Sequence, residues 1–161
     1  MIRIPLYVGL LFSGAAIGAD QAPTFAKLPI TEKFAGKPAT PLLKARIQRT
    51  FRTRIRDAAQ NGPNFAGRFT IAEWGCGAGC VSMAIVDEQS GAVSNGPFEV
   101  LGYGGPRKYE GGEDGLEYRI DSRLLVARGC PEEENCGTYY YEWNGTRFLL
   151  LRKVPASAEP K

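Results

Sequence analysis

The stretch WGCGAGC, residues 74–80, places two cysteines around three small residues, a spacing that could serve a redox centre, a metal clip or a structural disulfide. Redox pairs of the thioredoxin kind have two intervening residues and lie at a helix start, where the helix dipole lowers a thiol pKa. Here the glycines favour a hairpin turn instead. Because α-carbons that face each other at a hairpin base can lie about 4.4–6.8 Å apart, we expect a structural disulfide between Cys76 and Cys80. Redox exchange and a four-cysteine metal site are the alternatives.

The chain has two further cysteines, Cys130 and Cys136, on either side of the loop PEEEN. Four cysteines allow three pairings, and an antiparallel pairing of residues 124–129 with 137–143 would set Cys130 opposite Cys136. We therefore expect the pairs 76–80 and 130–136. Each closes a short loop and stabilises the fold by only about 2 kcal/mol.

Glu73 is the main candidate for acid–base chemistry. The hairpin register places it opposite Met83, on a strand face that also carries Ile71 and Ile85. A carboxylate on an apolar face is costly unless it is paired or protonated, and such acids cluster at functional sites. With Asp87 or Glu110 as a second acid, Glu73 could form the carboxylate pair of a glycan hydrolase. The alternative is an ion pair with a helix arginine, or a bulge that turns the side chain outward.

Histidine is absent, which excludes Ser-His-Asp and Cys-His catalysis and the usual nitrogen ligands of zinc, copper and haem. Any catalysis must rest on carboxylates, tyrosines, lysines or thiols, and we expect no cofactor and no metal. The formal net charge of +3 describes a weakly basic surface, which gives no case for nucleic acid as a partner.

Residues 1–19 have the pattern of a secretory signal peptide: Arg3, an apolar run over residues 4–17, and the small pair Gly18-Ala19. The run is shorter than the roughly 20 residues that span a bilayer. We expect cleavage before Asp20, a periplasmic or secreted mature chain, and no integral membrane segment after cleavage.

Two groups of residues are candidates for binding. The glycine-rich segment 102–115 fails the spacing of a dinucleotide loop but could form a mobile contact loop, or else a solvated connection. A predicted helix carries arginines opposite its apolar stripe, which could hold an anionic polymer or lipid head group, or could simply face solvent. The candidate binding residues are Tyr103, Arg107, Lys108, Tyr109, Arg49, Arg52 and Arg56.

The helix and strands that position these residues can be predicted from proline, glycine and capping residues and from the spacing of apolar residues. Residues 20–41 carry four prolines and predict an extended N-terminal arm, either laid over the domain or mobile. Thr40-Pro41 and Asn61-Gly62 are start and stop signals for one amphipathic helix. A single domain over 42–154 and a disordered tail over 155–161 follow. The predicted apolar stripe of the helix is Leu43, Ile47, Phe51, Ile55 and Ala58.

Everything after Gly62 has the pattern of strands and turns. Asn144-Gly145 predicts a two-residue hairpin turn with Trp143 opposite Thr146. Pairing of 124–129 with 137–143 sets Leu125 opposite Tyr141, so that successive apolar faces coincide. The predicted fold class is α+β: one N-terminal amphipathic helix packed on the apolar face of a curved antiparallel β-meander of about six to eight strands.

The segment GPNFAGRFTIAEWGCGAGC, residues 62–80, resembles a group of uncharacterised exported bacterial small β-rich proteins with an NFAG segment followed by WGCGxxC. The later DSRLLV and YYYEWNGTRF are similar to that group too, so the likeness spans about residues 60–152. Where the group has His-Tyr, this chain has Arg68-Phe69. The resemblance implies export and the 76–80 bridge, and it implies no activity.

These observations favour an exported, disulfide-braced binding module of the inhibitor or immunity kind. Its expected partner is a protein or an anionic component of the cell envelope. The competing hypothesis is a carboxylate-based hydrolase that acts on cell-wall glycan, and it depends on Glu73.

Overall fold

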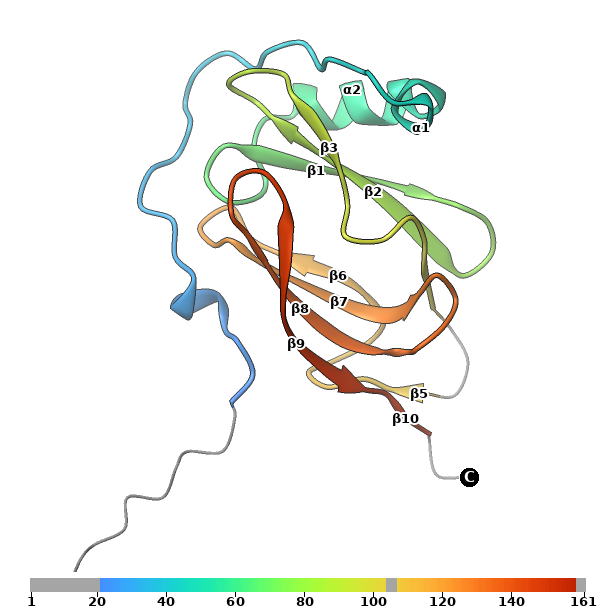
Figure 1. The fold of residues 1–161 in the computed structure, drawn as a ribbon. Helices are drawn as coiled ribbons and strands as arrows, with labels where there is room; N and C mark the ends of the chain where they lie inside the picture. The colour runs from blue at the N-terminus through green and yellow to red at the C-terminus, as the bar shows by residue number, and fades with distance from the viewer. Residues whose placement is uncertain (1–20, 104–106, 159–161) are drawn as a thin grey trace, which may run out of the picture.

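The computed structural model describes residues 21–103 and 107–158, and the predicted signal peptide lies outside them. The described chain is mainly antiparallel β-sheet with a short helical segment (Figure 1). Its elements are η1 (Phe25–Lys27), α1 (Arg46–Thr50), α2 (Arg52–Gln60), β1 (Phe69–Gly75), β2 (Cys80–Asp87), β3 (Val93–Asn95), β4 (Leu101–Gly102), β5 (Arg107–Lys108), β6 (Gly115–Tyr118), β7 (Leu124–Pro131), β8 (Gly137–Trp143), β9 (Phe148–Pro155) and β10 (Ser157–Ala158).

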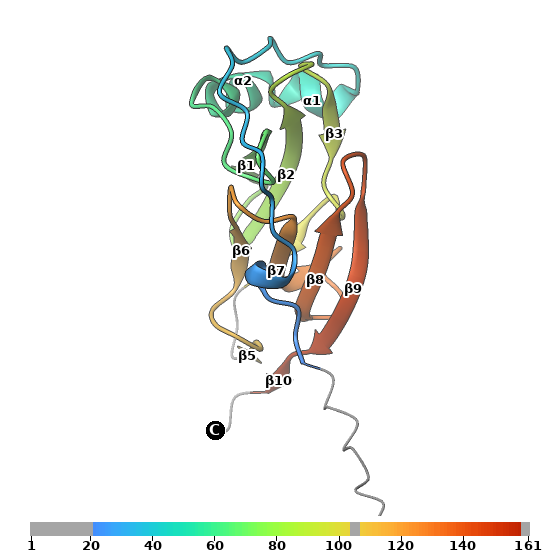
Figure 2. The same cartoon turned by 90° about the vertical axis from the view of Figure 1, so that its left-hand side faces the viewer.

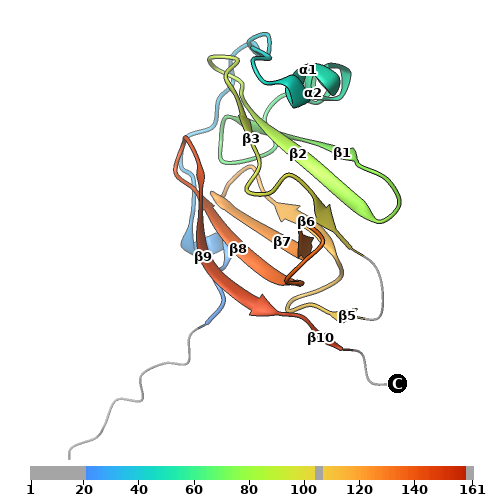
Figure 3. The ribbon, with the colours of Figure 1, turned by 45° about the vertical axis from the view of Figure 1, so that its right-hand side comes forward.

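Eight of the strands form one sheet in the order β1-β2-β4-β7-β8-β9, with β3 added to β2 and β6 added to β7. The expected strand number is confirmed, but the sheet is not a plain meander. It folds over, so that β1 and β2 cross above β7, β8 and β9 (Figure 3). The short β4 joins the two halves because it pairs with both β2 and β7.

The main hydrophobic core lies between these two halves. Strands β1 and β2 supply Ile71, Met83 and Ile85, and β7 and β8 supply Leu125 and Tyr141. Leu125 pairs with Tyr141 and Ala127 with Tyr139, as the alternation of apolar residues predicted. Buried faces on both halves therefore meet, which is how a folded antiparallel sheet buries one side of each strand.

Both predicted disulfides are confirmed. Cys76–Cys80 closes the β1–β2 hairpin and Cys130–Cys136 closes the β7–β8 hairpin, and no cysteine is free in the described chain. The predicted register around the first bridge is also confirmed, since Glu73 lies opposite Met83.

The turn between β8 and β9 differs from the prediction. Trp143 pairs with Phe148 rather than Thr146, so the turn has four residues instead of two. The cause is the Asn144 side chain, whose Oδ1 accepts hydrogen bonds from the backbone N–H groups of Thr146 and Arg147 at 3.0 and 2.9 Å. This local side-chain turn competes with the tighter Asn-Gly hairpin. The shift is by two residues, so Phe148 still faces the core, whereas Leu150 is exposed.

The helical segment begins later than predicted, at Arg46 instead of near Thr40-Pro41. Leu42 is held in an extended conformation, since its N–H donates to the carbonyl of Gly91 at 2.8 Å. The helix start is capped by Gln48, whose Oε1 accepts from the N–H groups of Lys44 and Ala45 at 2.9 and 3.0 Å. A further break at Phe51 divides the segment into α1 and α2.

The helices cover the opposite side of β1 and β2 from the main core, not the apolar face that the prediction assigned to them. Ile55 and Ala59 pack there against Ala72, Ala84 and Val86. The predicted stripe is partly wrong, because Ile47 is 44% exposed whereas Ala59 is buried. The packing of the two sheet halves on each other buries the face of β1 and β2 that carries Ile71 and Ile85, so α2 covers the opposite face.

The N-terminal arm is laid along the domain, the first of the two predicted possibilities (Figure 2). Phe25 and Leu28 pack on the outer faces of Leu124, Val126 and Tyr140. Buried Ser122 donates toward the carbonyls of Phe25 and Leu28 at 3.0 and 2.9 Å. The arm is therefore an integral wall of the domain.

The predicted disordered tail is wrong for its first residues. Pro155 ends β9, and β10 pairs with β5, with Ser157 opposite Lys108. Both strands are short, and each satisfies its backbone hydrogen bonds through the other. The sequence of the tail alone does not indicate this pairing. Residues 159–161 lie outside the described chain.

Candidate ligand-binding pocket

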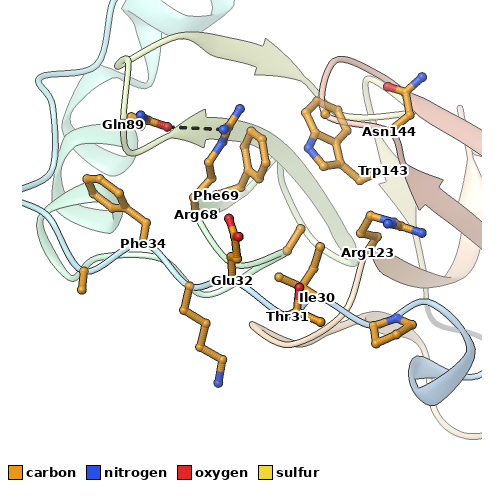
Figure 4. Close-up of a pocket in the computed structure, with 15 residues that line it drawn as sticks. Ile30, Thr31, Glu32, Phe34, Arg68, Phe69, Gln89, Arg123, Trp143 and Asn144 are labelled. Carbon is orange, nitrogen blue, oxygen red and sulfur yellow. Dashed lines mark hydrogen bonds between the residues drawn. The ribbon is translucent and has the colours of Figure 1, made fainter.

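A pocket of about 600 Å³ lies between the arm and one end of the folded sheet (Figure 4). We call it the arm pocket. Five segments far apart in the sequence build it: the arm, the start of β1, the turn after β2, the residue before β7, and the end of β8 with the turn that follows it. Its lining residues are Pro29, Ile30, Thr31, Glu32, Lys33, Phe34, Ala35, Ala66, Arg68, Phe69, Gln89, Arg123, Trp143, Asn144 and Gly145. The volume falls in the range of about 300–1,000 Å³ that is typical of small-molecule sites.

One side of the arm pocket is formed by Trp143 and Arg123, which lie together because the backbone N–H of Trp143 donates to the carbonyl of Arg123 at 2.9 Å. Trp143 is 2% exposed, and its ring packs against Phe69 and Phe148. Its indole N–H is buried and has no hydrogen-bond partner among the described residues. A buried donor normally has a partner, and one without a hydrogen bond lowers the free energy of unfolding by about 1–3 kcal/mol.

Arg123 has a similar feature. One terminal nitrogen lies 3.1 Å from Glu142, whereas the buried Nε has no partner within the described chain. The backbone of Arg123 is fixed from the arm side, since its N–H donates to the carbonyl of Leu28 at 2.9 Å. The wall thus holds two buried side-chain donors, and both belong to residues whose backbones are fixed by hydrogen bonds.

The facing wall carries Arg68 and Phe69 (Figure 4). Arg68 lies 3.3 Å from Asp87 and donates to Gln89 at 3.3 Å, and its guanidinium sits 5.0 Å from the centre of the Phe69 ring. The Phe69 ring meets Trp143 edge to face at a centroid distance of 5.3 Å. The aromatic rings of Phe69 and Trp143 thus lie beside the guanidinium groups of Arg68 and Arg123 in the lining of the pocket.

The arm closes the third side and is anchored at two points. The N–H of Ile30 donates to Asp121 at 2.8 Å and that of Phe34 donates to Gly67 at 2.9 Å. The three arm residues between these anchors, 31–33, are exposed. Gly67, with φ +79°, allows this close approach, because a β-carbon there would meet the carbonyl oxygen of Glu32 and would lie 2.6 Å from Ile30 Cγ2.

A second pocket, of about 580 Å³, lies between the helices and the β3–β4 segment. Phe51 and Trp74 stack there with ring centroids 4.6 Å apart. The indole N–H of Trp74 is also buried without a partner among the described residues. The second pocket offers apolar surface with the acids Glu99 and Glu132 at its wall and no arginine or lysine in its lining.

Glu73 is not the buried acid that the hydrolase hypothesis requires. It is exposed, and its Oε1 accepts a 2.6 Å hydrogen bond from the Tyr118 hydroxyl. Burial of Tyr118 and this bond to Glu73 raise the pKa of the Tyr118 hydroxyl above its ordinary value. The predicted conflict with the apolar face is resolved by a tyrosine on β6, a strand of the other half of the sheet, rather than by a helix arginine or a bulge.

Neither proposed second acid completes a carboxylate pair with Glu73. Asp87 lies four residue positions along the paired strands, about 13 Å away, and is paired with Arg68. Glu110 accepts from Tyr140 at 2.9 Å and from Arg152 at 2.8 Å. A glycosidase pair needs carboxyl groups roughly 5–10 Å apart in one cleft. The observation that favoured a hydrolase is therefore gone.

The predicted binding residues are not brought together. The helix arginines Arg49, Arg52 and Arg56 are exposed at one end of the molecule, and β5 lies at the other end (Figure 1). Arg49 and Arg52 donate to backbone carbonyls of their own helical segment. None of the seven predicted residues lines either pocket.

The glycine-rich segment is largely structured in its described part. Tyr103 packs against the main core and donates its N–H to Gly79 at 2.8 Å. Arg107 and Lys108 form β5, and Tyr109 makes a β-bridge with Gly112. The described part of the segment thus forms short paired segments.

Sequence reasoning missed the arm pocket, although one signal was present. The predicted pairing of Leu125 with Tyr141, extended by two residues, sets Arg123 beside Trp143. The contribution of the arm had no comparable signal, because its contacts to Asp121 and Gly67 have no periodicity in sequence.

No set of three or more carboxylate or cysteine side chains is arranged to hold a metal ion within the described chain. No helix of residues 21–103 and 107–158 has the length and apolar character needed to cross a membrane. Comparison with protein-family models found no match, and comparisons with curated proteins and with solved structures found none either.

Proposed function

We propose that this chain is an exported, disulfide-braced binding module, of the inhibitor or immunity kind, that works in the periplasm or outside the cell without a cofactor. Its ligand site is the arm pocket. The partner is a protein or an anionic component of the cell envelope that places one chemical group in this pocket.

The observation that carries the proposal is Trp143, which lines a pocket of ligand size and has a buried indole N–H without a partner in the described chain. Natural structures leave few such donors unmade, and an acceptor on a ligand would satisfy this one. The adjoining Nε of Arg123 adds a second donor of the same kind.

Two further features support export and a binding role. Paired cysteines with none free are characteristic of oxidising compartments. The signal-peptide pattern of residues 1–19 agrees with this. The bridges also brace the β1–β2 and β7–β8 hairpins, and a rigid scaffold lowers the entropic cost of binding.

The two tryptophans of the chain provide a direct test, because each lines one pocket. A ¹⁵N–¹H spectrum should show one indole cross-peak for each, and Trp143→Phe assigns the peak of the arm pocket. We expect a survey of small polar fragments to shift the Trp143 peak in a saturable manner. If fragments shift only the Trp74 peak, or neither peak, the arm pocket is not the ligand site and the proposal falls.

A further inference from the structure

The charges and donors of the arm pocket indicate what kind of group it takes. The lining carries three cations, Lys33, Arg68 and Arg123, and one acid, Glu32. Two of the cations are each paired with a carboxylate that lies outside the lining. Arg68 lies 3.3 Å from Asp87, and Arg123 lies 3.1 Å from Glu142. With Glu32 counted, three cations face three acids and the formal charges cancel, so a singly charged anion is better tolerated here than a phosphate dianion.

The donors that remain available also match a carboxylate. Arg123 uses one terminal nitrogen for Glu142 and keeps its Nε without a partner among the described residues. The indole N–H of Trp143 lies on the same wall. Two donors on one wall can serve the two oxygens of a carboxylate, and hydrogen bonds to a charged group are about twice as strong as neutral ones.

The rest of the lining is mixed, with Thr31, Gln89 and Asn144 beside an apolar part. Ile30, Phe34 and Phe69 face the space between the arm and β1 (Figure 4). Both donor atoms are buried, so a ligand reaches them only if the side chains around them move. The exposed arm residues 31–33 lie between the anchors Ile30 and Phe34, so this part of the wall can shift while the backbone bonds at either end stay in place.

We infer that the arm pocket binds a carboxylate monoanion that carries an apolar or aromatic body. The carboxylate pairs with Arg123 and the indole N–H of Trp143, and the body packs on Phe34 and Phe69. This inference rests on the proposed function and specifies the ligand class of the same pocket. The carboxylate can belong to a free small acid or to the C-terminus of a polypeptide.

A pair of probes that differ only in charge tests this. 3-Phenylpropionate and its neutral amide have the same shape, and titration of each into the full mature chain is followed at the two indole peaks. We expect the acid to shift the Trp143 peak and to bind at least about tenfold more tightly than the amide, as one charged hydrogen bond would give. Equal affinities for acid and amide would overturn the inference.

The matched variants are Trp143→Phe and Trp74→Phe, which each remove one buried indole N–H and keep an aromatic ring. Trp143→Phe is expected to weaken binding of the acid about fivefold to tenfold and to leave the amide unchanged. Trp74→Phe should leave both probes unchanged. Equal weakening by the two variants, or none by Trp143→Phe, would contradict the assignment. If Trp143→Phe does not fold, Arg123→Lys keeps the charge, removes the Nε donor and should weaken the acid in the same way.

N-acetyl-L-phenylalanine distinguishes the two sources of the carboxylate. Tighter binding than 3-phenylpropionate indicates a polypeptide C-terminus, because the added amide resembles a peptide bond, and equal or weaker binding indicates a small free acid. If none of the acids binds while fragments of other chemistry shift the Trp143 peak, the carboxylate inference fails and the binding module stands. If no fragment of any kind shifts it, both fail.

Discussion

Replacing Glu88 with glutamine is expected to raise the free energy of unfolding at pH 7 by about 1–3 kcal/mol. Glu88 directly follows β2 and is 0% exposed. The nearby Thr70 hydroxyl donates to the carbonyl of Gly62 at 2.9 Å, so neither carboxylate oxygen has a hydrogen-bond partner among the described residues. A buried, unpaired carboxylate is costly, whereas the amide keeps the shape without the charge. Chemical denaturation of the wild type and the Glu88→Gln variant measures the difference.

The same variant should change the pH dependence of stability. Desolvation by burial raises the pKa of Glu88 in the folded chain above its ordinary value of 4.5. Above pH 4.5 the unfolded chain releases this proton more readily than the folded chain, so stability falls as the pH rises toward the folded pKa and then levels off. Glu88→Gln should remove this decline. The exposed Glu99→Gln is the control, and an equal change in both variants would show that burial of Glu88 is not the cause.

Replacing Gly67 with alanine is expected to detach the arm from the sheet and to abolish binding in the arm pocket. A β-carbon at this position would collide with the carbonyl of Glu32, and the positive φ of +79° is itself unfavourable for alanine. We expect a loss of about 1–3 kcal/mol in the free energy of unfolding and faster proteolysis of residues 21–40. Denaturation and limited proteolysis with mass analysis measure these effects.

Gly62→Ala is the matched control for this substitution. Gly62 has a nearly identical φ of +80°, but a β-carbon there would meet nothing within 4 Å. Backbone strain alone therefore acts in Gly62→Ala, and both strain and collision act in Gly67→Ala. If the two variants lose the same stability and the arm stays protected in both, the close approach of the arm at Gly67 is not what holds the pocket wall in place.

Strand pairing was predictable wherever apolar alternation fixed it. Leu125 opposite Tyr141 follows from the period-two pattern and also sets Cys130 opposite Cys136, whereas Glu73 opposite Met83 follows from the predicted Cys76–Cys80 turn. A slip by one residue would turn a whole apolar face to solvent, so such registers are strongly specified.

The errors arose where one polar side chain decided the local geometry. Asn144 turns its oxygen back on Thr146 and Arg147 and lengthens the hairpin turn. Gln48 caps the helix from within, so Thr40-Pro41 is not the start. These contacts depend on side-chain orientation, which residue type and spacing leave undetermined.

The candidate site was beyond sequence reasoning for a different reason. Its walls come from the arm, from Arg68 and Phe69 at the start of β1, from Arg123 just before β7, and from Trp143 at the end of β8. Only the last pair follows from a predicted register. The arm reaches the pocket through hydrogen bonds at Asp121 and Gly67, and these contacts depend on how the whole sheet folds over.

The decisive measurement is a crystal structure of the mature chain with 3-phenylpropionate. We expect the ligand in the arm pocket, with a carboxylate oxygen about 2.7–3.2 Å from Trp143 Nε1 or from a nitrogen of Arg123, and the phenyl ring against Phe34 or Phe69. A ligand seated beside Trp74, or one in the arm pocket whose carboxylate points to solvent, would contradict it.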